Sequence, residues 1–285
     1  MKKLSFWLLL FFFHQANSQY YYKDIVAVAE LTSQMKNYLA NNINKVTATG
    51  ITPEGMPATD FSETQEVLSN GSILRITTRN KQRVSLLRHH FNSEGLLVST
   101  VDSTAGVRSV SNYTYNANGN IVSISNIATD ADSSGDFSQT EVHNYIYKNG
   151  KLDKMWRIIN NKDSLEVRFG LDENGNVIEE RNFKARVLSD PTYYYYDDKN
   201  RLTDIVRFNY KANRLLPDYL FEYDDNDRVI QKITTTSGKN IGYLTWRYIF
   251  NEKGLKTKEA LFVKERTPEG AGEYKLQGRI DYTYN

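Results

Sequence analysis

The sequence predicts a mainly β protein: a long antiparallel meander of repeated hairpins forming a strongly curled sheet or partial barrel, with one N-terminal amphipathic helix. Two observations support this fold class. A short phrase of aromatic, any residue, aromatic, polar turn and aliphatic recurs along most of the chain, with turn centres 24 to 31 residues apart. A helical spacing of apolar residues occurs near the N-terminus, before the first repeat.

Residues 1–18 are typical of an export signal peptide. Lys2 and Lys3 precede an apolar run, and the small residues Ala16 and Ser18 suit an export peptidase. The run is too short to cross a bilayer as a helix, which takes about 20 residues. We therefore expect an exported protein, periplasmic, extracellular or at the cell surface, that begins at Gln19 after cleavage.

Composition narrows the range of partners. The chain has no cysteine, so packing and strand pairing alone must hold the fold. Removing the signal takes away two of the 36 basic residues and none of the 34 acidic ones, so the charges of the mature chain balance. This balance argues against a nucleic-acid partner, because binding the phosphate backbone needs a basic surface. It also argues against membrane association through a polybasic patch.

Residues 19–46 are predicted to hold the helix, with Asp24 as its N-cap. One apolar stripe recurs there at steps of three or four: Ile25, Val28, Leu31, Met35, Leu39 and Ile43. The Lys/Arg-rich polar face of a membrane-surface helix is missing, so we expect the stripe to pack on the sheet.

Residues 47–65 are rich in glycine and proline and are predicted to be a linker loop. From 66 to 285 the chain alternates like β-strands, and each repeat has room for two strands and a tight turn. Glycine, asparagine or aspartate at every turn centre supplies the positive φ that such turns need. The centres are Gly71, Gly95, Gly119, Gly150, Gly175, Asn200, Asp227 and Gly254.

The two aromatic residues of each phrase stand two apart, so they project from one side of a strand and should form an aromatic row along one rim. The phrase resembles the YD-type repeats of the RHS family, as in Tyr196-Asp197, Tyr223-Asp224 and Tyr115-Asn116. In that family the repeats build a curling antiparallel sheet, usually a shell around a cargo domain. Because this sequence has no cargo segment after its last repeat, the resemblance implies a short, secreted, repeat-only relative.

One loop resembles the twelve-residue calcium loop of EF-hand proteins. Oxygen donors occupy its first, third and fifth positions, glycine the sixth and glutamate the twelfth, which suits the hard oxygen ligands of Ca²⁺. The resemblance implies a metal site at Asp130, Asp132, Ser134, Asp136 and Glu141. Strands are predicted on both sides of the loop, so we expect Ca²⁺ as a structural brace. The similar acidic segments 172–176 and 224–227 fall at hairpin tips and are interpreted as turn chemistry.

No catalytic motif is found. The histidines after the signal are His89, His90 and His143, and the first two must point to opposite faces of a strand. The sequence has no cysteine nucleophile, nucleophile elbow, zinc-protease motif or phosphate loop. We therefore predict a protein that is not an enzyme.

The main functional hypothesis is an exported β-repeat scaffold that displays loops to an unidentified protein or glycan, braced by calcium. One alternative is an outer-membrane β-barrel, which the charges on both faces of segment 179–186 argue against. Another is a periplasmic half-barrel lipid carrier, an analogy of architecture alone. A continuous apolar concavity would favour the carrier, and a filled one would favour the scaffold.

Overall fold

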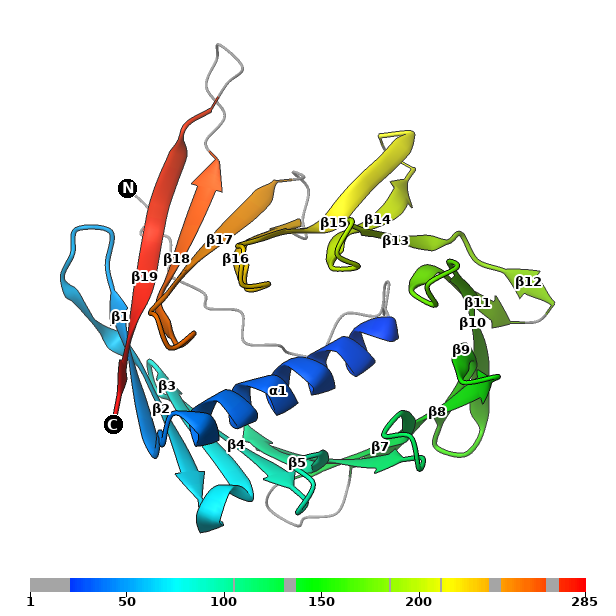
Figure 1. The fold of residues 1–285 in the computed structure, drawn as a ribbon, viewed down its shortest axis with the longest axis horizontal. Helices are drawn as coiled ribbons and strands as arrows, with labels where there is room; N and C mark the ends of the chain where they lie inside the picture. The colour runs from blue at the N-terminus through cyan, green and yellow to red at the C-terminus, as the bar shows by residue number, and fades with distance from the viewer. Residues whose placement is uncertain are drawn as a thin grey trace.

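The computed structural model describes residues 21–104, 106–130, 137–184, 186–210, 212–235, 242–264 and 272–285, so the expected signal peptide lies outside them. The described residues form one α-helix, a short 3-10 helix at Ser69–Gly71 and an antiparallel meander of strands (Figure 1). The helix α1 spans Tyr22–Ala40. The strands are β1 Lys45–Ile51, β2 Pro57–Leu68, β3 Ile73–Asn80, β4 Arg83–Phe91, β5 Leu97–Thr104, β6 Val107–Tyr115, β7 Ile121–Asp130, β8 Ser138–Lys148, β9 Lys151–Ile159, β10 Asp163–Leu171, β11 Val177–Lys184, β12 Val187–Leu188, β13 Thr192–Tyr196, β14 Leu202–Asn209, β15 Arg214–Tyr223, β16 Val229–Thr235, β17 Tyr243–Phe250, β18 Lys256–Lys264 and β19 Tyr274–Tyr284.

The meander closes into a barrel. β1 pairs with β2 on one side and with β19 on the other, from Val46 opposite Tyr284 to Ile51 opposite Arg279. β12 and β13 both pair with β11, so the wall is an 18-strand barrel. The antiparallel meander is confirmed, but the prediction of a partial barrel is wrong. Closure gives the backbone groups of the first and last strands a partner that an open edge would lack.

Residues 47–65 are not a linker loop, because they form most of β1 and the first part of β2. The glycines and prolines that suggested a loop surround a short turn between Thr52 and Met56, where Gly55 adopts a φ of 86°. Pro57 is the first residue of β2. A proline fits there because a strand tolerates a missing N–H donor at its first residue.

The tight hairpin turns are capped by the polar residue that follows the second aromatic. Asp224 Oδ1 accepts hydrogen bonds from the backbone N–H groups of Asn226 and Arg228, which fixes the turn around Asp227, where φ is 61°. This arrangement confirms that the acidic segments at 172–176 and 224–227 are turn chemistry. Equivalent caps are Asn92, Asn116, Asp172, Asp197 and Asn251.

The second aromatic of the phrase ties each hairpin to the one before it. Where this residue is tyrosine, its hydroxyl donates to a backbone carbonyl just past the preceding turn, at 2.6 to 3.0 Å. These bonds join Tyr115 to Leu97, Tyr147 to Ile121, Tyr196 to Val177, Tyr223 to Leu202 and Tyr284 to Lys256. The predicted aromatic row therefore lies on the inner face, next to the tight turns.

The helix lies inside the barrel and crosses the ring of strands (Figure 1). Its side chains Val28, Met35 and Tyr38 are buried in the same core as Met155 and Val167 of the wall, so the predicted packing on the sheet is confirmed. The predicted N-cap is wrong. The cap residue is Tyr21, and Asp24 lies within the first turn, where its side chain binds the wall instead. No helix among the described residues is long and apolar enough to cross a membrane.

The inner surface is packed unevenly. Along β5 to β14 several inward side chains are almost fully buried, among them Leu97, Met155 and Tyr194, and others such as Tyr115 and Tyr147 are partly buried. Along β15 to β17 the inward side chains, such as Lys232, Trp246 and Tyr248, are only partly buried. The helix α1 itself keeps exposed residues, including Glu30 and Ser33. The inner surface therefore combines tightly packed apolar positions with partly buried charged and aromatic side chains.

Candidate functional site

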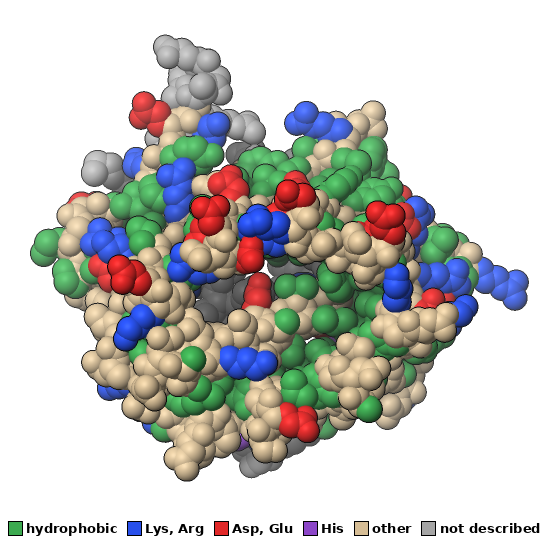
Figure 2. All heavy atoms as spheres, in the orientation of Figure 1, with side chains coloured by type: hydrophobic (Ala, Val, Ile, Leu, Met, Phe, Trp, Pro, Cys, Tyr) green, Lys and Arg blue, Asp and Glu red, His purple; other side chains and the backbone are tan. Residues whose placement is uncertain are grey.

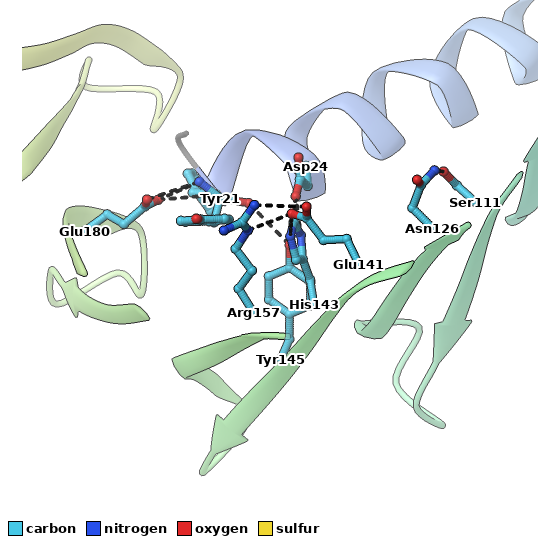
Figure 3. Close-up of polar contacts among 10 residues, drawn as sticks. Tyr21, Asp24, Ser111, Asn126, Glu141, His143, Tyr145, Arg157 and Glu180 are labelled. Atoms are coloured by element: carbon cyan, nitrogen blue, oxygen red, sulfur yellow. Dashed lines mark hydrogen bonds and ion pairs between the residues drawn. The ribbon is translucent and has the colours of Figure 1, made fainter. Parts of the chain in front are cut away.

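The helix is fastened to the wall by a row of alternating charges near its N-terminus (Figure 3). His143 lies on the inner face of β8, and its Nδ1 is 2.9 Å from Oδ2 of Asp24 on α1. Its Nε2 is 2.8 Å from Oε1 of Glu141, two residues earlier on the same strand face. Arg157 on β9 donates two hydrogen bonds to the two oxygens of Glu141, at 2.7 and 3.0 Å.

This geometry fixes the protonation of His143. A carboxylate accepts but does not donate, so an imidazole held between two carboxylates must donate from both nitrogens and is therefore an imidazolium. Burial opposes the charge, but the hydrogen bonds to Asp24 and Glu141 outweigh it and raise the pKa of His143 to about 9. Burial would raise the pKa of Glu141, but the hydrogen bonds from His143 and Arg157 outweigh it and lower this pKa to about 2.

A second anchor holds the backbone at the start of the helix. Both carboxylate oxygens of Glu180, on the inner face of β11, lie 3.1 Å from the N–H of Tyr21, and one accepts from the N–H of Tyr22 at 3.0 Å. The hydroxyl of Tyr194 donates to the same carboxylate at 2.8 Å. Unpaired N–H groups and the positive end of the helix dipole both favour a carboxylate at this place. Burial nevertheless raises the pKa of Glu180 to about 7.

These two anchors act as a lock rather than as a reactive centre. In the first anchor the side chains of His143, Asp24 and Glu141 are each 16% exposed or less, and each of these charges lies beside a charge of opposite sign. Removing one member would leave another charge buried without a counter-charge, which is costly. The anchors therefore hold α1 against the β8–β11 part of the wall.

The open side of the lumen holds charged groups without such partners. Glu30 on α1 and Lys232 on β16 interact electrostatically but form no ion pair within 4 Å. Neither makes a hydrogen bond with the described residues. Partial removal from water raises the pKa of Glu30, whose side chain still keeps an exposed surface, and burial lowers the pKa of Lys232.

Aromatic side chains surround this pair. Trp246 lies directly opposite Lys232 in the strand pairing, and Tyr248 lies two residues further along the same inner face. Both are partly buried. Half-exposed aromatic faces beside charged groups provide contact area and specific polar contacts for a small molecule.

Further along the wall from Tyr248, the charged side chains neutralise one another. Lys256 Nζ is 2.5 Å from Glu259 Oε2, and the hydroxyl of Tyr282 donates to the same oxygen at 3.1 Å. The ammonium of Lys256 also lies over the rings of Tyr248 and Tyr282. This paired group leaves Glu30 and Lys232 as the charges without a close partner in this part of the described lumen.

The lumen is accessible along the helix. A pocket of about 390 Å³ lies between the helix and the tight turns of β5 to β8, lined by Val28, Thr32, Lys36, Tyr115 and Tyr147 among others. Seen from the face shown in Figure 2, the molecule is hollowed near its centre, and acidic side chains border the hollow.

The predicted calcium ligands are only partly described. Asp132, Ser134 and Asp136 lie outside the described residues. Asp130 ends β7 and accepts a hydrogen bond from the N–H of Phe137. Glu141 lies on β8 opposite Asn126 of β7, and its side chain points into the lumen toward His143. No group of three or more metal-binding side chains occurs within the described ranges. The calcium site stays a prediction. In the structure, the Glu141 side chain is bound to His143 and Arg157.

The other histidines lie as their spacing predicts. His89 points inward and is buried, with Nδ1 3.0 Å from the hydroxyl of Thr100, whereas His90 points outward and is partly exposed. Burial lowers the pKa of His89 to about 4, so this side chain is neutral. Its Nε2 is one of the few buried polar atoms without a partner in the described part of the chain.

Sequence reasoning missed both the lock and the open pair. A signal for the lock exists, because Glu141, His143, Tyr145 and Tyr147 alternate along one strand and therefore share a face. The pairing of Glu30 with Lys232 has no local signal, since α1 and β16 are remote in sequence and meet only through barrel closure.

Comparisons with known proteins do not identify a family. No family model matches the chain, and no curated protein matches it. Among solved structures, a porin-like protein from Bacteroides uniformis is similar over 85% of this chain and 98% of its own, with 12% identity and a TM-score of 0.34. The Tc holotoxin pore of Photorhabdus luminescens is similar over 79% of this chain and 16% of its own, with 10% identity and a TM-score of 0.30. At these scores neither likeness supports an argument about fold or function, and the YD-repeat resemblance stays a prediction.

Proposed function

We propose that this protein is an exported, water-facing β-barrel that binds a small polar ligand in its lumen, between α1 and the inner face of β15–β17. The single observation that carries the proposal is the pair Glu30 and Lys232, two charges without close partners beside half-exposed aromatic rings. Elsewhere on the lumen wall, the charged groups described above are held by ion pairs or hydrogen bonds. A ligand would supply the missing partners for this pair.

The polar lumen argues against the lipid-carrier alternative. A lipid carrier needs a continuous apolar concavity, whereas Lys232, Lys256 and Glu259 interrupt the inner wall on its open side. Burying an acyl chain against them would desolvate charged groups without replacing their water contacts. The ligand expected here is therefore one that carries its own polar groups.

Charged pairs on the outer wall favour water over lipid outside the barrel. Residues that alternate with the buried inner side chains face outward, and several form ion pairs along the strands. These pairs are Arg75–Glu66, Arg168–Glu166, Arg181–Glu179 and Arg279–Asp281. They lie on strands spread around the barrel, where a membrane barrel would carry an apolar band about 25 Å tall.

Purification without detergent tests the water-facing barrel against the outer-membrane alternative, which a closed wall also fits. We expect the mature chain, expressed with its signal peptide, to fractionate with soluble exported proteins and to stay monodisperse in buffer. Recovery only from the membrane fraction with detergent would contradict the proposal and favour the alternative.

Trp246 gives a direct readout of lumen binding. The chain has three tryptophans, of which Trp7 lies in the expected signal peptide and Trp156 faces outward beside Lys154. The variant Trp156→Phe therefore leaves Trp246 as the only tryptophan of the mature chain.

We expect some members of a panel of small polar solutes, covering sugars, amino acids and dicarboxylates, to change its fluorescence saturably. The matched control restores Trp156 and replaces Trp246 by phenylalanine, which should remove the response. A panel without any response in either protein would contradict lumen binding.

A further inference from the structure

We propose that the pocket between α1 and the tight turns of β5–β8 binds a small amphiphilic anion, with its apolar body in the pocket and its carboxylate at Lys36. This site differs in place and in ligand class from the lumen site proposed above, and it does not depend on that site. The ligands concerned are short fatty acids and aromatic monocarboxylates.

The size and the walls of the pocket carry the argument. Its volume of about 390 Å³ lies within the range of small-molecule sites, about 300–1,000 Å³. The helix contributes Ile25, Val28 and Ala29 to one wall. The facing wall, from the tight turns, includes Leu96 and Ile121. Most of the lining is apolar, so a ligand that fills the pocket needs an apolar body.

Two tyrosines complete the apolar lining with their rings. The hydroxyl of Tyr115 donates to the carbonyl of Leu97 at 2.6 Å, and the hydroxyl of Tyr147 donates to the carbonyl of Ile121 at 3.0 Å. Because these bonds engage both hydroxyl protons and fix both rings, the tyrosines offer the pocket ring surface. Both side chains are only partly buried, so a ligand would remove this surface from water without ordering the side chains anew.

Lys36 supplies the charge that the ligand must match. Within the described part of the chain, it is the single charged residue that lines the pocket. Its Cε lies 3.9 Å from the place that a Cβ would take at Gly95, so its stem crosses the tight turn between β4 and β5. It forms no ion pair or hydrogen bond with the described residues, including Glu94 of the same turn. A free cation beside an apolar pocket selects a ligand with one negative charge and repels a cation.

A hydroxyl on the same helix face suits the same ligand. Thr32 lines the pocket one helical turn before Lys36, so the two side chains are neighbours on the helix surface. A hydroxyl can donate to a carboxylate oxygen that the ammonium group also holds. The polar end of the ligand is therefore expected at this part of the helix, and its apolar body against the tyrosine rings.

Calorimetric titration of the mature protein with octanoate tests the proposal. Three further probes each lack one feature of the ligand: octanol has no charge, octylamine has the opposite charge, and acetate has no apolar body. We expect saturable binding of octanoate that is at least about tenfold tighter than that of each other probe, which corresponds to about 1.4 kcal/mol. A rise in melting temperature with octanoate serves as a second readout.

A pair of alanine variants tests the position of the site. Ala29→Leu places additional atoms in the pocket and should weaken octanoate at least about tenfold. Ala27→Leu is the matched control, because Ala27 lies on the opposite side of the helix and should leave octanoate binding unchanged. Both alanines are exposed and leucine is a good helix former, so both variants should keep the fold.

Two variants of Lys36 test the charge. Lys36→Gln should weaken octanoate about tenfold and leave octanol unchanged, because only octanoate has a charge to lose a partner. Lys36→Arg keeps the positive charge and should keep the affinity for octanoate.

Three outcomes would overturn the proposal. Octanol or octylamine that binds as tightly as octanoate would exclude the anionic ligand. Octanoate binding that Ala29→Leu leaves unchanged would place the ligand elsewhere. The third outcome is the absence of both saturable heat and a rise in melting temperature with octanoate. None of these results bears on the Trp246 response to polar solutes, so the lumen site is tested separately.

Discussion

The two sides of the barrel lumen differ in whether their charged side chains have close partners. Under the helix, along β8 to β11, every buried charge has a partner within hydrogen-bonding distance, and apolar residues such as Met155 fill the space between them. On the opposite side, at Glu30 and Lys232, charges remain apart and rings stay half-exposed. The first side therefore stabilises the fold, and the second is where we propose that a ligand binds, because unpaired charged groups are often retained at functional sites.

Core truncation should show the largest difference between the two sides. Met155→Ala removes a side chain with 0% exposure and should lower the free energy of unfolding by about 2–5 kcal/mol. Leu244→Ala, on the inner face of β17 where packing is looser, should cost clearly less. Chemical denaturation of both variants makes the comparison. Equal losses would show that the open side is packed as tightly as the covered one.

The pH dependence of stability should come mainly from the covered side. Because the pKa of His143 is raised to about 9 from 6.5, its contribution is present below pH 6.5 and lost as the pH rises toward 9. Because the pKa of Glu180 is raised to about 7 from 4.5, stability also falls between pH 4.5 and 7. Melting temperatures from pH 4.5 to 9.5 should therefore decline in two steps.

Two variants assign these steps. His143→Gln should flatten the decline above pH 6.5 and lower the stability at pH 6 by about 2–3 kcal/mol, because its charged hydrogen bonds are lost. Glu180→Gln should flatten only the decline below pH 7. If the melting temperature of His143→Gln declines above pH 6.5 as it does in the unsubstituted protein, this histidine is not an imidazolium in the folded protein.

The tyrosine ties between hairpins predict smaller and opposite effects. Tyr115→Phe removes one hydroxyl bond to Leu97 and should cost about 0.5–1.5 kcal/mol. Phe250 ends β17 at the same place in the repeat, so Phe250→Tyr should gain a bond to the carbonyl of Val229 and raise stability by up to about 1 kcal/mol. Denaturation midpoints check both. A loss in Phe250→Tyr would show that the repeat geometry changes on the open side.

Removing a charge from the open side should have the smallest effect. Lys232→Met is expected to change stability by less than about 0.5 kcal/mol, or to raise it, because burial already disfavours the charge of this lysine. The matched substitution on the covered side is His143→Gln. If Lys232→Met lowers the free energy of unfolding as much as His143→Gln does, the two sides of the lumen do not differ in charge pairing, and the binding proposal loses its basis.

Local chemistry made the hairpins predictable, and long-range pairing made closure unpredictable. The turn caps, the positive φ at Asp227 and the same-face aromatics all follow from neighbours in sequence, so the meander was predicted correctly. The prediction of a loop at 47–65 is wrong because Gly55 and Pro57 belong to a short turn between β1 and β2. In sequence, such a turn has the same composition as a longer loop. The contact between β1 and β19 has no local signal at all.

The candidate site was less predictable for the same reason. Glu141 was assigned to a calcium loop from its spacing to Asp130, yet its side chain faces the lumen because the register with β7 and β9 decides its direction. Nothing in the sequence around Glu30 indicates which strand lies near it. Residues that act together across a barrel can be found from sequence only when the closure itself is known.

The seam between β1 and β19 has a consequence for how the chain is made. Val46 and Tyr284 are partners, so the first strand to emerge during synthesis waits for the last one before its backbone is satisfied. Folding therefore depends on contacts between residues far apart in sequence, which slows it. Until these contacts form, the edge strand is unpaired and prone to aggregate. A chaperone that shields nascent strand margins should increase the yield of this protein more than that of a helical protein of equal length.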